Sequence, residues 1–75
     1  MNKARRKELQ KALDLLSEAK DIINQCRDEE QDAFDNMPEG LQSSERGEQM
    51  EEYISLMDEA YDNIEDVESN IEEML

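Results

Sequence analysis

The sequence predicts an all-α fold, an antiparallel two-helix hairpin that a second copy completes to a homodimeric four-helix bundle. Two observations carry this prediction. Apolar side chains recur at steps of three and four in both halves of the 75-residue chain, which is the period of an amphipathic helix. The only proline and both glycines lie close together, at Pro38, Gly40 and Gly47. We therefore treat residues 1–75 as one domain, with a helix over about 3–35, a hinge over about 36–43 and a helix over about 44–74.

The first helix is predicted from a stripe of apolar and small side chains with coiled-coil spacing. Its members are Leu9, Ala12, Leu16, Ala19, Ile23, Cys26, Ala33 and Met37. With heptad positions lettered a to g, Cys26 occupies a d position among small neighbours, so we expect a core residue that lets the helices approach closely. Glu30 falls on the same stripe, where we expect Arg27 or the hydroxyl of Tyr53 to satisfy its carboxylate.

The hinge predicts a short helical turn over about residues 38–41. Asn36 precedes Pro38 and an acid in the order of an N-cap, a proline and a first-turn carboxylate. Ser43 or Ser44 suits the N-cap of the second helix. Gly47 is expected to weaken the first turn of that helix.

The second helix is predicted from a heptad repeat of apolar residues. The a positions are Met50, Met57, Ile64 and Ile71, and the d positions are Tyr53, Ala60, Val67 and Met74. A short linker folds this helix back antiparallel, which predicts that Ile23 lies near Met57.

Additional apolar residues widen the surface of the first helix beyond what one facing helix covers. Leu13, Leu15 and Ile22 lie beside the main stripe, with Leu56 on the second helix. We expect a second copy to cover this strip, and the alternative is that a different partner docks there.

Charge divides the chain into two parts. The net charge is −14, yet residues 1–27 carry seven bases and four acids, whereas residues 28–75 carry one base and eighteen acids. Such an acidic chain repels phosphate, so we expect no direct binding of nucleic acid. The antiparallel fold predicts that residues 3–11 lie beside Glu68, Glu72 and Glu73 and neutralise them.

The most regular polar feature is a pair of acids after each a position of the second helix. These residues are Glu51, Glu52, Asp58, Glu59, Glu65, Asp66, Glu72 and Glu73. Positions b and c point away from the partner helix, so the carboxylates form a stripe of ~33 Å with one charge per ~4 Å, against ~3.4 Å along one DNA strand. We predict that the stripe binds a basic groove of a partner protein, and the alternative is a solvated face that only keeps the protein in solution. The predicted partner-binding residues are Glu51, Glu52, Asp58, Glu59, Asp62, Glu65 and Asp66.

The composition argues against catalysis, cofactors and membrane insertion. The chain has no histidine, so it lacks a general base that titrates near neutral pH and a histidine ligand for zinc. Cys26 is its only cysteine, so no internal disulfide can form. A calcium loop could begin at Asp28 and end at Glu39, but Ala33 stands at the turn glycine and the run lies within the predicted helix. We expect no enzyme, cofactor or metal site. No apolar run approaches the ~18 residues needed to span a membrane, so we expect a cytoplasmic protein.

The segment from Arg27 to Glu48, after a basic start, resembles small acidic helical proteins of bacteriophages and prophages. The resemblance is most distinctive from Phe34 to Gly47 and implies a phage origin and a small accessory role. Many proteins of this class occupy host nucleic-acid-binding proteins, including defence nucleases. With the acidic stripe, this resemblance predicts a DNA-mimic inhibitor of a host protein. The alternative is a structural or adaptor coiled coil that acts through its apolar strip.

The hinge is a second candidate site. Its residues are Phe34, Asn36, Pro38, Leu41, Ser44 and Arg46. We predict a specific role for them, and the alternative is that Phe34 and Leu41 plug the end of the bundle while Asn36 and Ser44 cap helices.

Overall fold

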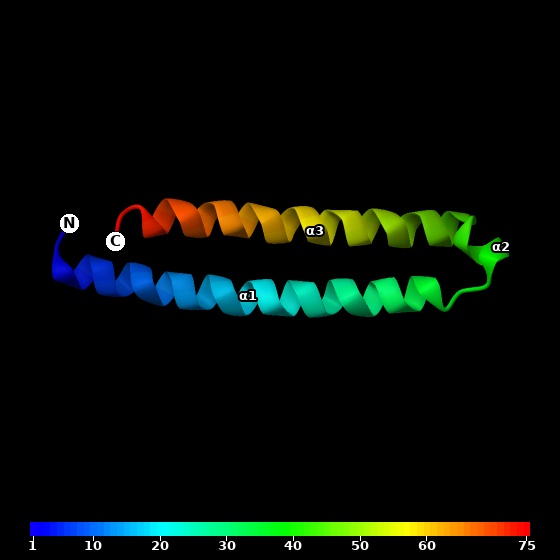
Figure 1. Ribbon diagram of the computed structural model, residues 1–75, viewed down its shortest axis with the longest axis horizontal. Coiled ribbons are helices and arrows are strands. Elements are labelled where there is room, and N and C mark those ends of the chain that lie inside the picture. The colour runs from blue at the N-terminus through cyan, green and yellow to red at the C-terminus, as the bar shows by residue number, and fades with distance from the viewer.

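The chain folds into three helices without strands, and the computed structural model describes all 75 residues. Helix α1 spans Lys3–Asp35, α2 spans Glu39–Gln42 and α3 spans Glu45–Glu72. The two long helices lie side by side and antiparallel, with α2 at the turn and both termini at the other end (Figure 1). The result is a rod with Cα extents of 58 × 15 × 12 Å. The predicted all-α hairpin is confirmed, and α3 ends two residues earlier than predicted.

Local hydrogen bonds define both ends of α1. The Asn2 side chain is the N-cap and accepts a hydrogen bond of 2.8 Å from the backbone N–H of Arg5. At the other end, the backbone N–H of Asn36 donates to the carbonyl of Asp32 at 3.0 Å. The predicted N-cap role of Asn36 is therefore wrong. Asn36 is the C-cap of α1, because the extended backbone of Pro38 (φ −55°, ψ 144°) occupies the N-cap of α2.

The hinge is built on a close approach between α2 and the first turn of α3. The Ser44 hydroxyl is the N-cap of α3, where it accepts a 3.4 Å hydrogen bond from the N–H of Gly47 and donates to the carbonyl of Leu41. Gly47 is buried, and a Cβ added there would lie 2.0 Å from the Gln42 carbonyl oxygen. The amide of Gln42 in turn donates to the Phe34 carbonyl at 2.9 Å, which ties α2 to α1. Gly47 is thus a steric requirement of the hinge, which the sequence pattern did not indicate.

The two long helices meet mainly through their a and e positions, and of the predicted d positions only Ala12, Ala19 and Ala60 are half-buried. In α1 the half-buried residues at a and e positions are Leu9, Leu13, Leu16, Lys20, Ile23, Arg27, Glu30 and Phe34. In α3 they are Met50, Ile54, Met57, Tyr61, Ile64, Glu68 and Ile71, and among them only Ile54 is fully buried, at 7% exposure. The predicted core positions of Cys26 and Ala33 are wrong, because this rotation leaves both side chains exposed.

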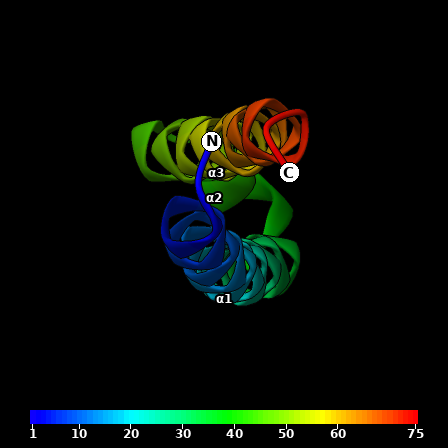
Figure 2. The same cartoon turned by 90° about the vertical axis from the view of Figure 1, so that its left-hand side faces the viewer.

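The hairpin exposes more surface than a compact protein of its mass. Its accessible surface is 5745 Å², and only 2 of its 75 residues are buried. A compact monomer of this mass exposes about 4,800 Å². Viewed along the rod, the long helices form a single pair (Figure 2), so both edges of their contact are open to solvent. The hairpin therefore lacks the enclosed core that normally stabilises a chain of this length.

Candidate functional site

The two edges of the contact between α1 and α3 differ in chemistry. Because the helices are antiparallel, equivalent heptad positions of both helices lie on the same edge. The polar edge, which carries the e and b positions, holds the cross-helix ion pairs of Lys20 and Arg27. The apolar edge carries the d and g positions and holds most of the exposed large apolar side chains.

Lys20 is the centre of the first ion-pair cluster on the polar edge. Its ammonium nitrogen lies 2.7 Å from a carboxylate oxygen of Glu68 and 3.6 Å from one of Glu65. The same nitrogen lies 5.2 Å from the ring centroid of Tyr61, within the range of a cation–π interaction. The hydrogen bond with Glu68, opposed in part by desolvation, raises the pKa of Lys20.

Arg27 forms the second cluster, one heptad further along the edge. Its Nε donates a 2.9 Å hydrogen bond to Asp58, and its Nη1 lies 3.5 Å from Asp28. The hydrogen bond with Asp58 is the main cause of a raised Arg27 pKa. Arg27 is therefore directed away from Glu30, and the expected hydrogen bond of Glu30 with Arg27 or Tyr53 does not form.

The predicted neutralisation of the N-terminal bases by the end of α3 does not occur through direct ion pairs. All four ion pairs involve Lys20 or Arg27, and no base in residues 3–11 takes part in one. Met74 lines a hollow with Arg5 and Leu9, so the C-terminal end of α3 does lie beside the first turns of α1. The bases in residues 3–11 are nevertheless left without a direct ion-pair partner.

The predicted partner-binding residues all lie exposed on α3, but they are not equivalent. Asp58 and Glu65 lie at the polar edge, where Asp58 pairs with Arg27 and Glu65 pairs with Lys20. The other five form no ion pair; four of them occupy c and f positions on the outer side of α3, and Glu51, at a b position, lies where this side joins the polar edge. We name this surface the acidic face; it consists of Glu51, Glu52, Glu59, Asp62 and Asp66.

The apolar edge carries a row of exposed apolar side chains along the rod, which we name the apolar strip. Its large side chains are between 43% and 62% exposed, and they are Leu15, Ile22, Tyr53, Leu56, Val67 and Met74. The hinge half of the strip contains a groove of about 480 Å³. Its lining residues are Ile23, Cys26, Glu30, Tyr53, Leu56, Met57 and Ala60.

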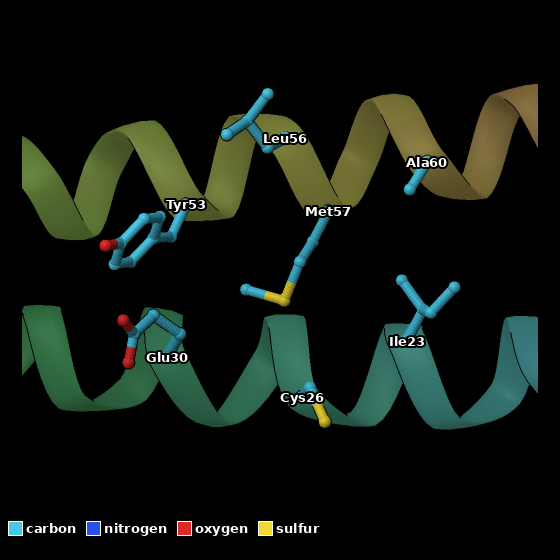
Figure 3. A pocket seen from close by; sticks show the side chains of 7 residues that line it. All are labelled: Ile23, Cys26, Glu30, Tyr53, Leu56, Met57 and Ala60. Carbon is cyan, nitrogen blue, oxygen red and sulfur yellow. The ribbon is translucent and has the colours of Figure 1, made fainter.

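The close-up of this groove shows how the strip is built. Met57 reaches from α3 toward Cys26, and Ile23 points up toward Ala60 (Figure 3). The predicted proximity of Ile23 and Met57 is confirmed, since both line the groove. A second hollow lies on the same edge near the termini, and its lining residues are Met1, Ala4, Arg5, Glu8, Leu9 and Met74.

The predicted hinge residues do not converge on one site. Phe34 and Ser44 are half-buried, whereas Asn36, Pro38, Leu41 and Arg46 are exposed. The expected plugging role of Leu41 is wrong, because its side chain is 53% exposed at the tip of the rod. Arg46 lines a shallow polar hollow with Glu45 and Gln49 and pairs with no acid. The hinge hydrogen bonds described above account for Ser44 as a cap.

The arrangement of the acids does not form a metal centre. No group of three or more carboxylate or cysteine side chains lies close enough together to hold a metal ion. The calcium-loop alternative requires an irregular loop, whereas residues 28–35 belong to the continuous helix α1. No helix of the chain combines the length and apolar character needed to cross a bilayer.

Comparisons of the chain with protein-family models, curated proteins and solved structures found no match. Two surfaces of the hairpin therefore remain as candidates for function, the acidic face and the apolar strip.

Proposed function

We propose that this protein is a non-enzymatic accessory protein of phage type, whose acidic face binds and blocks a basic nucleic-acid-binding groove of a host protein. The supporting observation is that five exposed carboxylates share the outer side of α3 and none of them has a cationic partner in the chain. A solvated helix face needs no such concentration of one charge.

The geometry of α3 suits a partner that recognises a line of phosphates. From Glu51 to Asp66 the helix rises ~22 Å, so five carboxylates give one charge per ~4 to 5 Å. The helix holds these charges in fixed positions, which lowers the conformational entropy that a partner must remove on binding. Their long-range field also speeds the encounter with a basic surface.

The acidic face and the neighbouring Asp58 contain like charges that repel one another in the free protein. Asp58, Asp62 and Asp66 follow at intervals of four residues, which places neighbouring carboxylates on the same side of the helix. Arg27 neutralises only the first of them. A basic groove would relieve this repulsion, so the binding energy would be largely electrostatic and would fall with added salt.

A displacement assay tests the proposal. Bacterial lysate proteins retained on heparin are loaded with a fluorescent DNA duplex, and the chain is added while anisotropy is recorded at 50 mM and 300 mM salt. The test variant carries Glu51→Lys, Glu59→Lys and Asp62→Lys, which leave the ion pairs of Lys20 and Arg27 intact. The control carries three reversals on the outer side of α1, at Asp14, Glu18 and Asp21. Three reversals in either variant bring the net charge from −14 to −8.

We expect the wild type and the control to displace DNA at low salt, with a steep loss at high salt. The test variant should need at least about tenfold more protein for the same displacement. Equal displacement by both variants, or displacement that salt does not affect, would show that the acidic face is not the binding surface.

The apolar strip supports a second candidate, a structural or adaptor coiled coil that associates with itself in a four-helix bundle. The open groove at Leu56 and the single buried apolar residue, Ile54, favour a further helix pair on this edge. Association through the strip should persist at high salt, because apolar contacts are not screened.

A further inference from the structure

We propose that a second copy of this chain covers the apolar strip in the reversed orientation, so that the basic N-terminal end of each copy lies beside the acidic hinge end of the other. This inference rests on the proposed self-association. It specifies the surface through which the two copies associate and the relative direction of the two rods.

The exposed area is the first argument for a second copy. The hairpin exposes 5745 Å², which is about 950 Å² more than a compact monomer of the same mass. A stable protein–protein interface buries about 800 Å² on each partner. Two copies joined along the strip would therefore reach the burial that one hairpin lacks.

The position of the strip is the second argument. It lies along one edge of both long helices, from the hollow at Met1 and Met74 to the groove at Tyr53. The acidic face lies on a different side of α3, so the acids do not block the approach of an equally acidic copy. A four-helix bundle forms when two such edges meet.

Charge decides the direction. The bases at one end of the rod are unpaired, and they are Lys3, Arg5, Arg6, Lys7 and Lys11. Unpaired acids gather at the other end of α1 and in α2, and they are Glu29, Glu30, Asp32, Asp35 and Glu39. A dimer with the copies in the same direction sets two acidic hinge ends side by side, whereas the reversed dimer sets each acidic hinge end beside the bases of the other copy.

The contacts of the reversed dimer can be specified. Suppose that the two-fold axis passes through residue 19, the middle of α1. Each residue of α1 then faces the residue in α1 of the second copy for which the two residue numbers add up to 38. Arg5 lies on the apolar edge at a d position and lines its second hollow, and Lys11 flanks the strip at a c position. They then come close to Ala33 and Arg27 of the second copy, and the Arg27 side chain is directed to the polar edge. Glu29 and Asp32 flank the strip in that region and supply the opposing carboxylates.

Sedimentation velocity tests the surface. The wild type is expected as a dimer of twice 8.8 kDa. Leu56→Glu places a charge in the strip at a side chain that is 51% exposed in the hairpin, and we expect at least about a tenfold weaker association. Ser55→Glu adds the same charge one residue earlier on the outer side of α3 and should leave the dimer intact. A monomeric wild type, or an unchanged dimer with Leu56→Glu, would overturn the proposal.

A charge swap tests the direction. Arg5→Glu with Lys11→Glu should weaken the reversed dimer, and adding Glu29→Lys with Asp32→Lys should restore it. Glu29→Lys with Asp32→Lys alone should also weaken the reversed dimer, because it sets bases beside Arg5 and Lys11. In a dimer of equal direction the same two changes relieve repulsion between the acidic hinge ends and strengthen association, which would overturn the reversed orientation.

A distance measurement gives the direction independently of affinity. With Cys26→Ser and a spin label at Lys7→Cys, the two labels of the reversed dimer lie at least ~36 Å apart along the rod, because residue 7 is 12 residues from the axis. In a dimer of equal direction they lie within about 25 Å, the width of a bundle. The short distance would refute the reversed orientation. If the wild type forms the reversed dimer but does not displace DNA in the anisotropy assay, the proposed function is refuted and the dimer proposal stands.

Discussion

Replacing Gly47 with alanine tests whether the hinge depends on close contact between α2 and α3. In the first turn of a helix, alanine is intrinsically more favourable than glycine by about 1 kcal/mol. The structure predicts the opposite result. The added Cβ would lie 2.0 Å from the oxygen and 2.5 Å from the carbon of the Gln42 carbonyl, and 2.7 Å from the Leu41 oxygen.

All three of these atoms belong to the backbone, so no flexible side chain can move aside. The contact must open by more than 1 Å to reach the 3.4 Å of ordinary van der Waals contact. Such a shift strains or breaks the hydrogen bonds of Ser44 with Leu41 and of Gln42 with Phe34, each worth about 1 kcal/mol. Together with the cost of overpacking, we expect a net loss of about 1 to 3 kcal/mol.

Thermal unfolding followed by circular dichroism measures this loss. For a domain of this size the expected decrease in Tm is about 5 to 20 °C. All samples need the same protomer concentration, since association would raise Tm. Gly40→Ala is the matched control, because no atom lies within 4 Å of its added Cβ and Tm should stay equal or rise. A Gly47→Ala protein that melts at or above the wild-type temperature would refute this account of the hinge.

Three further outcomes follow from the described contacts. Ser44→Ala should lower the free energy of unfolding by about 1 kcal/mol through loss of the N-cap, whereas Ser43→Ala should have a smaller effect, and equal losses in chemical denaturation would contradict this role. Because Glu68 raises the pKa of Lys20, the stabilisation from this pair is complete below the ordinary lysine pKa and is lost as pH rises through the raised value. The Tm difference between the wild type and Lys20→Met should therefore vanish in strongly alkaline solution, and a difference that persists there would assign it to packing. Added NaCl should raise Tm, since 22 acids are served by only four ion pairs and screening reduces their repulsion; a decrease would mean that the ion pairs dominate.

The helices themselves could be predicted because their signals are local. The step of three and four, the cluster of Pro38 and both glycines, and a serine before an acid-rich turn each depend on neighbouring residues. The antiparallel arrangement followed from the short hinge, and the contact of Ile23 with Met57 followed from the same length.

The rotation of the helices about their axes could not be read from apolar spacing alone. The d positions of α1 hold apolar or small residues such as Cys26, whereas the e positions include Lys20 and Arg27, so the pattern favoured d. In the structure the e positions face the other helix because the large side chains of Phe34 and Ile54 pack in the contact. The long basic side chains at e positions also form ion pairs across it. Complementary charges at facing e and b positions were the signal that could have indicated this rotation.

The candidate site was predicted in composition but not in detail. The acids of α3 are exposed as expected, yet the pairing of Asp58 with Arg27 depends on the register between helices far apart in sequence. The steric role of Gly47 likewise arises only when the Gln42 carbonyl is folded against it.

The acidic face and the apolar strip occupy different sides of α3, and this separation makes the protein a candidate bivalent ligand. When a second copy covers the strip, both acidic faces stay open, one on each outer side of the bundle. A target that presents two basic grooves at a matching spacing would then bind the second face intramolecularly, at an effective concentration in the millimolar range. Weak electrostatic contact at a single groove could thereby become tight binding to a dimeric target without any additional contact.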